Sequence, residues 1–189
     1  ANGYGLGAGR AVDRLAAAGC RDFYVATWAE AAALAPWSEG LRLSVLHGVR
    51  DEDMQAALAG PARPVLSTAR QIRRWRASGG GPCDALVDTG INRLGVAVEE
   101  VRNGVLNGLT IDTLMSHLAC ADEESPANEA QLRLFGSLRE RFPAVTMSLA
   151  NSAGIALGEE YHFDLTRPGL AIYGGVTREE MGSFIRPVA

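Results

Sequence analysis

The chain has 189 residues, a length at which a single domain buries roughly 70% of the surface of its unfolded chain. With 22 acidic residues against 18 basic ones, and a net charge of −4, it shows no basic stripe that would suggest a nucleic acid or an anionic membrane as a partner. No apolar run approaches the roughly 20 residues that span a bilayer, and no signal peptide is recognisable at the N-terminus, so a cytoplasmic location is expected.

Metal binding is not expected from the residues that usually ligate metals. Cys20, Cys83 and Cys120 are far apart and show no paired spacing, and the three histidines are equally scattered. Every one of the 18 basic residues is arginine, so the chain contains no lysine. The charge balance favours a small partner, and the scattered cysteines and histidines give no reason to expect a metal ion.

Two patterns alternate along the chain. Apolar periodicity, caps and breakers predict helices at 7–19, 28–35, 51–59, 69–77, 96–106 and 126–142. Short apolar runs predict strands at 23–26, 41–46, 64–66, 85–87, 114–117, 145–149 and 165–170. In the long helix at 126–142, Leu132, Phe135, Leu138 and Phe142 share one side. No linker or low-complexity segment interrupts this order.

This alternation predicts an α/β fold of parallel βα units, and its even rhythm favours a closed (β/α)8 barrel of the TIM type over an open sheet. Such a barrel has eight strands. Seven are found, and residue 1 already reads like the loop after a strand, so the first strand is expected to be absent from this sequence. We treat residues 1–189 as one partial barrel domain.

Polar residues gather where the predicted strands end, which is where barrels place their sites. They include Asn2, Tyr4, His47, Asp88, Thr89, Arg93, Ser116, His117, Asn151, Ser152 and Arg167. Near the C-terminus, Gly169 allows close approach of the backbone, Ser152 offers a hydroxyl to a phosphate, and Arg167 offers a guanidinium to an acceptor. The alternative is a turn after a buried strand, with Arg167 in a structural salt bridge.

Five blocks in order resemble the alanine racemase family, a group of fold-type III pyridoxal phosphate enzymes. They are 1–5 (ANGYG), 88–95 (DTGINRLG), 116–122 (SHLACAD), 150–154 (ANSAG) and 167–174 (RPGLAIYG). The resemblance implies an eight-stranded barrel followed by a C-terminal β domain, in a homodimer.

The resemblance also implies roles for single residues. Tyr4, Ser152 and the backbone of Gly169 and Leu170 match the phosphate-binding positions, and Asn151 lines the same rim. Tyr173 is included among the cofactor-binding residues, with packing as its alternative role. Arg167 matches the arginine beside the pyridine nitrogen, His117 the residue that supports it, and Arg93 the arginine that contacts the cofactor's phenolic oxygen and the substrate carboxylate.

Three departures from the family pattern stand out. The family's cofactor-binding lysine, which is also one of the two bases, directly precedes the residue matched by Ala1, and we expect the parent gene to encode it there. The second base is a tyrosine of the C-terminal domain, contributed by the other subunit. Leu86 occupies a place where many members carry a carbamylated lysine. The 189-residue polypeptide alone is therefore expected to be inactive.

The activity implied by the resemblance is interconversion of L- and D-alanine, by two-base proton transfer on the Schiff base of alanine with pyridoxal 5'-phosphate, which supplies D-alanine for peptidoglycan. An arginine beside the pyridine nitrogen disfavours protonation of that nitrogen and so suppresses transamination. Three alternatives remain open: a non-catalytic pyridoxal phosphate carrier, another fold-type III amino-acid racemase, and an inactive barrel remnant.

Overall fold

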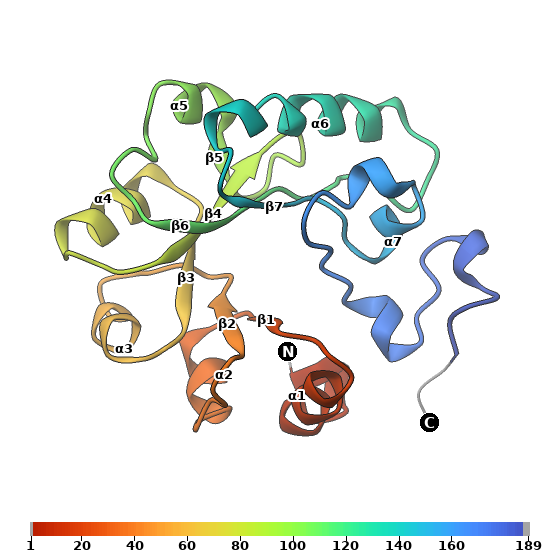
Figure 1. The fold of residues 1–189 in the computed structure, drawn as a ribbon, viewed down its shortest axis with the longest axis horizontal. Coiled ribbons are helices and arrows are strands. Elements are labelled where there is room, and N and C mark those ends of the chain that lie inside the picture. The colour runs from red at the N-terminus through yellow and green to blue at the C-terminus, as the bar shows by residue number, and fades with distance from the viewer. Residues whose placement is uncertain (1, 187–189) are drawn as a thin grey trace. The chain divides into compact units, whose positions relative to one another are not determined.

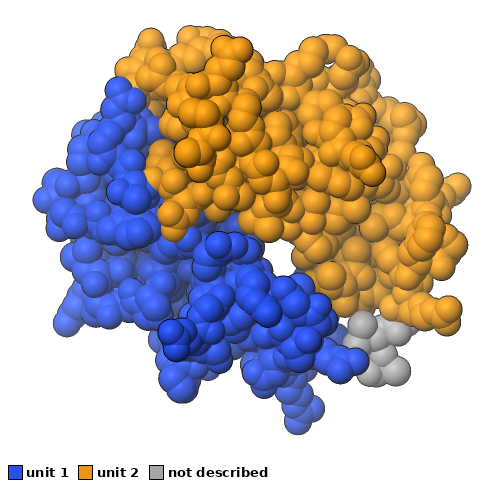
Figure 2. All heavy atoms as spheres, viewed as in Figure 1, with its two compact units in different colours: residues 1–84, 106–110 blue, residues 85–105, 111–189 orange. Residues whose placement is uncertain are grey.

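The computed structural model describes residues 2–186 (Figure 1). The chain forms two compact units, one of residues 1–84 with 106–110 and one of residues 85–105 with 111–189 (Figure 2). Both units alternate helices with parallel strands, as the sequence predicts. Among the described helices, none has the length and apolar character needed to cross a membrane.

The first unit carries three parallel strands in sequence order. Strands β1 (Asp22–Val25) and β2 (Arg42–Val45) pair along their full length, and β2 pairs in turn with β3 (Arg63–Leu66). Its helices are η1 (Asn2–Gly5), α1 (Ala8–Ala17), α2 (Trp28–Ala33), α3 (Met54–Ala59) and α4 (Ala69–Ala77).

Local sequence signals explain where two of these helices begin. The Thr27 hydroxyl accepts from the N–H of Glu30 at 3.3 Å, and Thr68 accepts from Gln71 at 3.2 Å, so both threonines cap a helix. The core of this unit is built by apolar side chains that are almost fully buried: Leu43, Val45, Val65, Leu66, Ile72 and Trp75.

The second unit is also built on parallel strands. Strand β4 (Cys83–Asp88) begins in the first unit and ends in the second. Its neighbour in the sheet is β6 (Ile111–Met115), and β6 pairs in turn with β7 (Thr146–Ser148). The short strand β5 (Val96–Ala97) also pairs with β4. Helices α5 (Val98–Arg102) and α6 (Pro126–Gly136) lie along one side of these strands (Figure 1). Short helices complete the unit: η2 (Arg139–Arg141), α7 (Ser152–Ile155), η3 (Glu159–Tyr161), η4 (Leu170–Tyr173) and η5 (Glu179–Met181).

Helix α6 is shorter than the sequence predicts. The expected continuous helix to residue 142 is wrong, because the Ser137 hydroxyl donates to the carbonyl of Leu134 at 2.7 Å and the chain then continues as η2. Phe135 and Leu138 are buried as expected, and Phe135 meets the ring of Phe163 edge-on at 5.0 Å.

Two other expected elements are also corrected. The segment 96–106 begins as β5, because Val96 pairs with Val87, and α5 is followed by turns at Gly104, whose φ is +87°. Residues 165–169 form no strand. They are held beside β7 by separate hydrogen bonds, and Pro168 has no N–H to continue a ladder.

Candidate functional site

The guanidinium of Arg167 occupies a defined position in the second unit. It donates to the hydroxyl of Ser148, at the end of β7, and to the carbonyl of Ser116, which follows β6. Both serines are fully buried. Because these two acceptors are neutral oxygens, they orient the guanidinium without cancelling its charge.

The chain before Arg167 explains how the side chain reaches this place. The N–H groups of Asp164 and Leu165 both donate to the carbonyl of Met147, at 3.0 and 3.2 Å, and the N–H of Arg167 donates to that of Ala150 at 2.9 Å. The Ser148 hydroxyl in turn donates to the carbonyl of Leu165 at 2.5 Å. Residues 164–167 are therefore fixed against β7, with Arg167 at the end of the strand.

Ser152 forms a second polar point in the same unit. Its hydroxyl oxygen accepts from the N–H groups of Gly169 and Ala171, at 3.0 and 3.1 Å, and the residue is only 4% exposed. With both lone pairs engaged, the hydroxyl still has its proton to donate. Asn151 precedes it and caps α7, accepting from the N–H of Gly154 at 2.8 Å.

The remaining residues expected to bind the cofactor differ in their surroundings. The N–H of Gly169 is engaged by Ser152, so a phosphate that used this donor would replace an existing bond. Leu170 begins η4 and is 41% exposed, and Tyr173 ends η4 and is half-buried. Tyr4 belongs to the first unit, where it lies in η1 with a φ of +54° and is 61% exposed. The cofactor-binding roles of these four residues stay predictions.

Arg93 sits in a loop whose shape is fixed by backbone contacts. The carboxylate of Asp88 accepts from the N–H groups of Gly90 and Asn92, at 2.9 and 3.1 Å, and Asn92 takes the left-handed conformation. Arg93 itself is exposed and makes no hydrogen bond or ion pair with any other residue that the structure describes. Leu86 offers it no polar support. Arg93 is therefore an available cation on a structured loop.

His117 follows β6 and is affected by both arginines. Burial, followed by the charges of Arg167 and then Arg93, lowers the pKa of its imidazole from 6.5 to about 4. The ring is therefore neutral at pH 7. Both arginines therefore lie near enough to His117 to affect its charge, and Arg167 also donates to the carbonyl of the neighbouring Ser116.

The low pKa of His117 makes a pH-dependent difference in stability testable. Between pH 6.5 and about 4 the unfolded chain binds a proton at this residue and the folded chain does not, so the folded state loses stability as the pH falls through that range. The unfolding free energies of His117→Gln and of wild type are measured with urea at both ends of the range. We expect the difference between them to change by about 2–3 kcal/mol in favour of His117→Gln as the pH falls from 7.5 to 4. A constant difference between the two proteins would show that His117 titrates normally.

Two residues of the site were not assigned a role from the sequence. Ser148 holds Arg167, and Gln131, on α6, donates from Nε2 to the hydroxyl of Thr89 and to the carbonyl of His117, both at 3.0 Å. Gln131 is 2% exposed. The available signal was a polar residue on the buried side of a helix, four positions before the buried Phe135.

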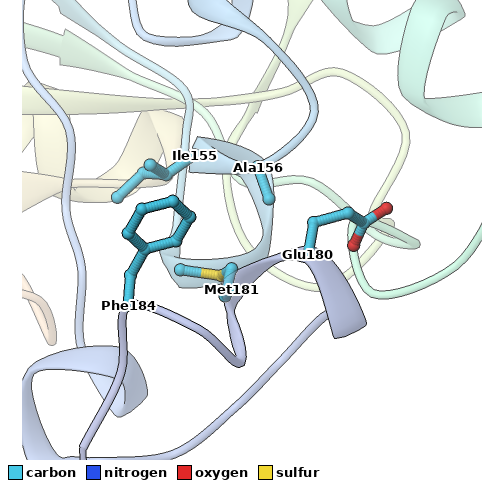
Figure 3. A pocket seen from close by; sticks show the side chains of 5 residues that line it. All are labelled: Ile155, Ala156, Glu180, Met181 and Phe184. Carbon is cyan, nitrogen blue, oxygen red and sulfur yellow. The ribbon is translucent and has the colours of Figure 1, made fainter.

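An apolar pocket of about 330 Å³ lies elsewhere in this unit (Figure 3). It is lined by Ile155, Ala156, Glu180, Met181 and Phe184, and the Glu180 carboxylate is directed away from the ring of Phe184. None of the residues expected at the site lines it. The pocket therefore has no part in the arrangement around Arg167.

Comparison with known proteins agrees with this geometry. The family model described as "Alanine racemase, N-terminal domain" matches residues 1–177. The biosynthetic alanine racemase of Agrobacterium fabrum is 41% identical over 100% of this chain and 51% of its own length, and the alanine racemase of Rhodospirillum rubrum is 44% identical over 93% and 50%. The chain thus spans about half the length of the curated relatives it matches.

Solved structures give the same result. The structure of alanine racemase from Bartonella henselae with covalently bound pyridoxal phosphate is 30% identical and superposes with a TM-score of 0.88, covering 99% of this chain and 58% of that one. The biosynthetic alanine racemase of Pseudomonas aeruginosa gives a TM-score of 0.86 at 28% identity, over 99% and 55%. The expected TIM-type α/β fold class is confirmed. The chain belongs to the alanine racemase family, within the part described by its N-terminal domain.

Proposed function

We propose that this chain provides the cofactor-binding domain of a pyridoxal 5'-phosphate-dependent alanine racemase, which interconverts L- and D-alanine. The observation that carries the proposal is the arrangement of Arg167, held by Ser116 and Ser148 beside a neutral His117. The match to the family over residues 1–177 supports it, as does the pyridoxal phosphate bound in the Bartonella henselae enzyme.

The residues present fit a phosphorylated pyridine ring. The Ser152 hydroxyl, with its proton still to donate, and the backbone around Gly169 and Leu170 would hold the phosphate. The Arg167 guanidinium is permanently protonated and can only donate, so it would face an unprotonated ring nitrogen. When bound, pyridoxal phosphate supplies the electron sink that makes the Cα proton of an amino acid acidic.

The substrate's carboxylate would be recognised by Arg93. Its guanidinium is exposed and has no bonded partner in the described part of the chain, and a guanidinium binds a carboxylate through two parallel hydrogen bonds. The neutral His117 adds no competing charge of its own. In this proposal the described residues bind and orient the cofactor and the substrate.

Three finer features belong to the same proposal. The complete product would act as a homodimer, in the cytoplasm, and supply D-alanine for peptidoglycan. The alternative that the site also accommodates is a pyridoxal phosphate carrier without catalysis. The two functions differ at Arg93, because a carrier has no substrate carboxylate to bind.

The activity is tested with the complete gene product, incubated with pyridoxal phosphate and L-alanine and followed by chiral chromatography. We expect D-alanine to accumulate until both enantiomers are equal. Arg93→Gln should raise KM for alanine by about tenfold or more, corresponding to loss of a charged contact. Cofactor binding without any D-alanine would favour the carrier.

The phosphate-binding role of Ser152 can be tested separately from activity. Ser152→Ala should weaken binding of pyridoxal phosphate by roughly tenfold, as expected for one lost hydrogen bond to a charged group, while binding of unphosphorylated pyridoxal changes little. Absorbance titration measures both constants. Ser125→Ala, which removes the cap of α6, is the matched control. An equal loss for both compounds would show that Ser152 only maintains the local fold.

A further inference from the structure

Three side chains form a buried chain of hydrogen bonds behind the candidate site. Gln131 Nε2 donates to Thr89 Oγ1 at 3.0 Å, Thr89 Oγ1 and Ser116 Oγ are 2.7 Å apart, and Ser116 Oγ donates to the carbonyl of Val87 at 2.8 Å. All three residues are at most 6% exposed. This row of hydrogen bonds runs from α6, past the end of β4, to the segment that follows β6.

The direction of this chain is determined by its two ends. Ser116 has one hydroxyl proton, which goes to Val87, so it accepts from Thr89. Thr89 therefore uses its own proton toward Ser116 and accepts from the amide of Gln131. Each hydroxyl in this row of hydrogen bonds donates toward Val87 and accepts from the residue before it. The side chain at position 131 must therefore be a donor.

Gln131 also holds the backbone on which His117 is carried. Its second Nε2 proton goes to the carbonyl of His117 at 3.0 Å, and its Oε1 accepts from the N–H of Ala119 at 2.9 Å. One side chain thus fixes the segment 117–119 and, through Thr89, the start of the loop that carries Arg93. It does so from a helix that carries none of the proposed binding residues.

We propose that Gln131 is a positioning residue that sets the placement of His117 and of the Arg93 loop relative to each other. It touches neither substrate nor cofactor and acts through Thr89 and the backbone at 117–119. The consequence for alanine binding rests on the proposed function. The placement of His117 does not depend on it.

The test compares Gln131→Met with wild type in the complete gene product. Methionine keeps the length and most of the volume of glutamine but cannot donate or accept in the same way. Without these bonds the segment at His117 loosens and gains water. The Cε1–H signal of His117, assigned by its absence from His117→Gln, is followed by NMR as the pH is changed. In Gln131→Met we expect the pKa of His117 to rise from about 4 toward 6.5. In the same variant KM for alanine should rise about tenfold, while the Kd for pyridoxal phosphate stays within about twofold.

Two controls separate positioning from simple packing. Phe135→Leu damages the same buried face of α6 without touching the hydrogen bonds, and should lower Tm while leaving the pKa of His117 at about 4. Thr89→Ser keeps the hydroxyl and should behave as wild type, whereas Thr89→Val should reproduce the rise in KM.

The outcomes distinguish this inference from the proposed function. A shifted His117 pKa in Gln131→Met supports the positioning role even if the complete gene product proves unable to racemise alanine. If the pKa stays at about 4 while Tm falls as it does in Phe135→Leu, Gln131 is only a core residue and the inference is overturned.

Discussion

Replacing Arg167 with glutamate is expected to reduce racemisation of alanine by the complete gene product at least about 100-fold. The new carboxylate would face the carbonyl of Ser116, which now accepts from the guanidinium, and would place a negative charge where the proposed site needs a permanent donor. A carboxylate also favours a protonated pyridine ring, so transamination to pyruvate should become measurable.

The same substitution has a second readout that needs no cofactor. The charge of Arg167 contributes to the low pKa of His117, so its replacement by an anion should raise that pKa well above about 4. Arg139→Glu reverses the charge of the exposed pair with Asp164 and is the matched control, with little effect expected on either measurement. An unchanged ratio of racemisation to transamination would mean that Arg167 is only structural.

Gly95→Ala should be among the most destabilising single substitutions in the chain. The φ of Gly95 is +132°, and a Cβ there would lie 2.4 Å from the N atom of Asp88 and 2.7 Å from the carbonyl carbon of Val87. Backbone cannot move aside as a flexible side chain would. Strain and overlap together should cost roughly 3–5 kcal/mol of unfolding free energy.

Thermal unfolding measures this effect, and Gly79→Ala is its matched control. Gly79 also has a positive φ, +67°, but a Cβ there meets nothing within 4 Å. Its substitution should cost only about 1–2 kcal/mol, the usual penalty for a left-handed alanine. Because Gly95 closes the loop of Arg93, Gly95→Ala should also raise KM for alanine. Equal losses in Tm for the two variants would contradict the steric argument.

The elements that carry the site were largely predictable from sequence. Short motifs with a special backbone requirement placed Arg167, Ser152 and His117 at strand ends, and the structure brings Arg167 and His117 together. Such motifs are informative because a turn or a helix cap is formed by residues that are neighbours in the sequence. Strands in the first unit were likewise expected within one or two residues of their observed bounds.

What the sequence did not reveal depends on contacts between distant segments. Gln131 reads as one polar position in an amphipathic helix, and only the fold shows that it reaches Thr89 and His117. Similarly, Val96 was assigned to a helix because its pairing with Val87 is not visible in local periodicity. The segment at 165–170 is apolar enough for a strand, but it is held by single bonds around Met147 and Ala150 instead.

Exchange of the α-proton in D2O tests whether this domain serves racemisation of alanine. The complete gene product with pyridoxal phosphate is incubated separately with L-alanine and with D-alanine, and the Cα–H signal is followed by proton NMR. We expect the signal to disappear from both substrates as both enantiomers form. Bound pyridoxal phosphate with the signal of both enantiomers unchanged would contradict it.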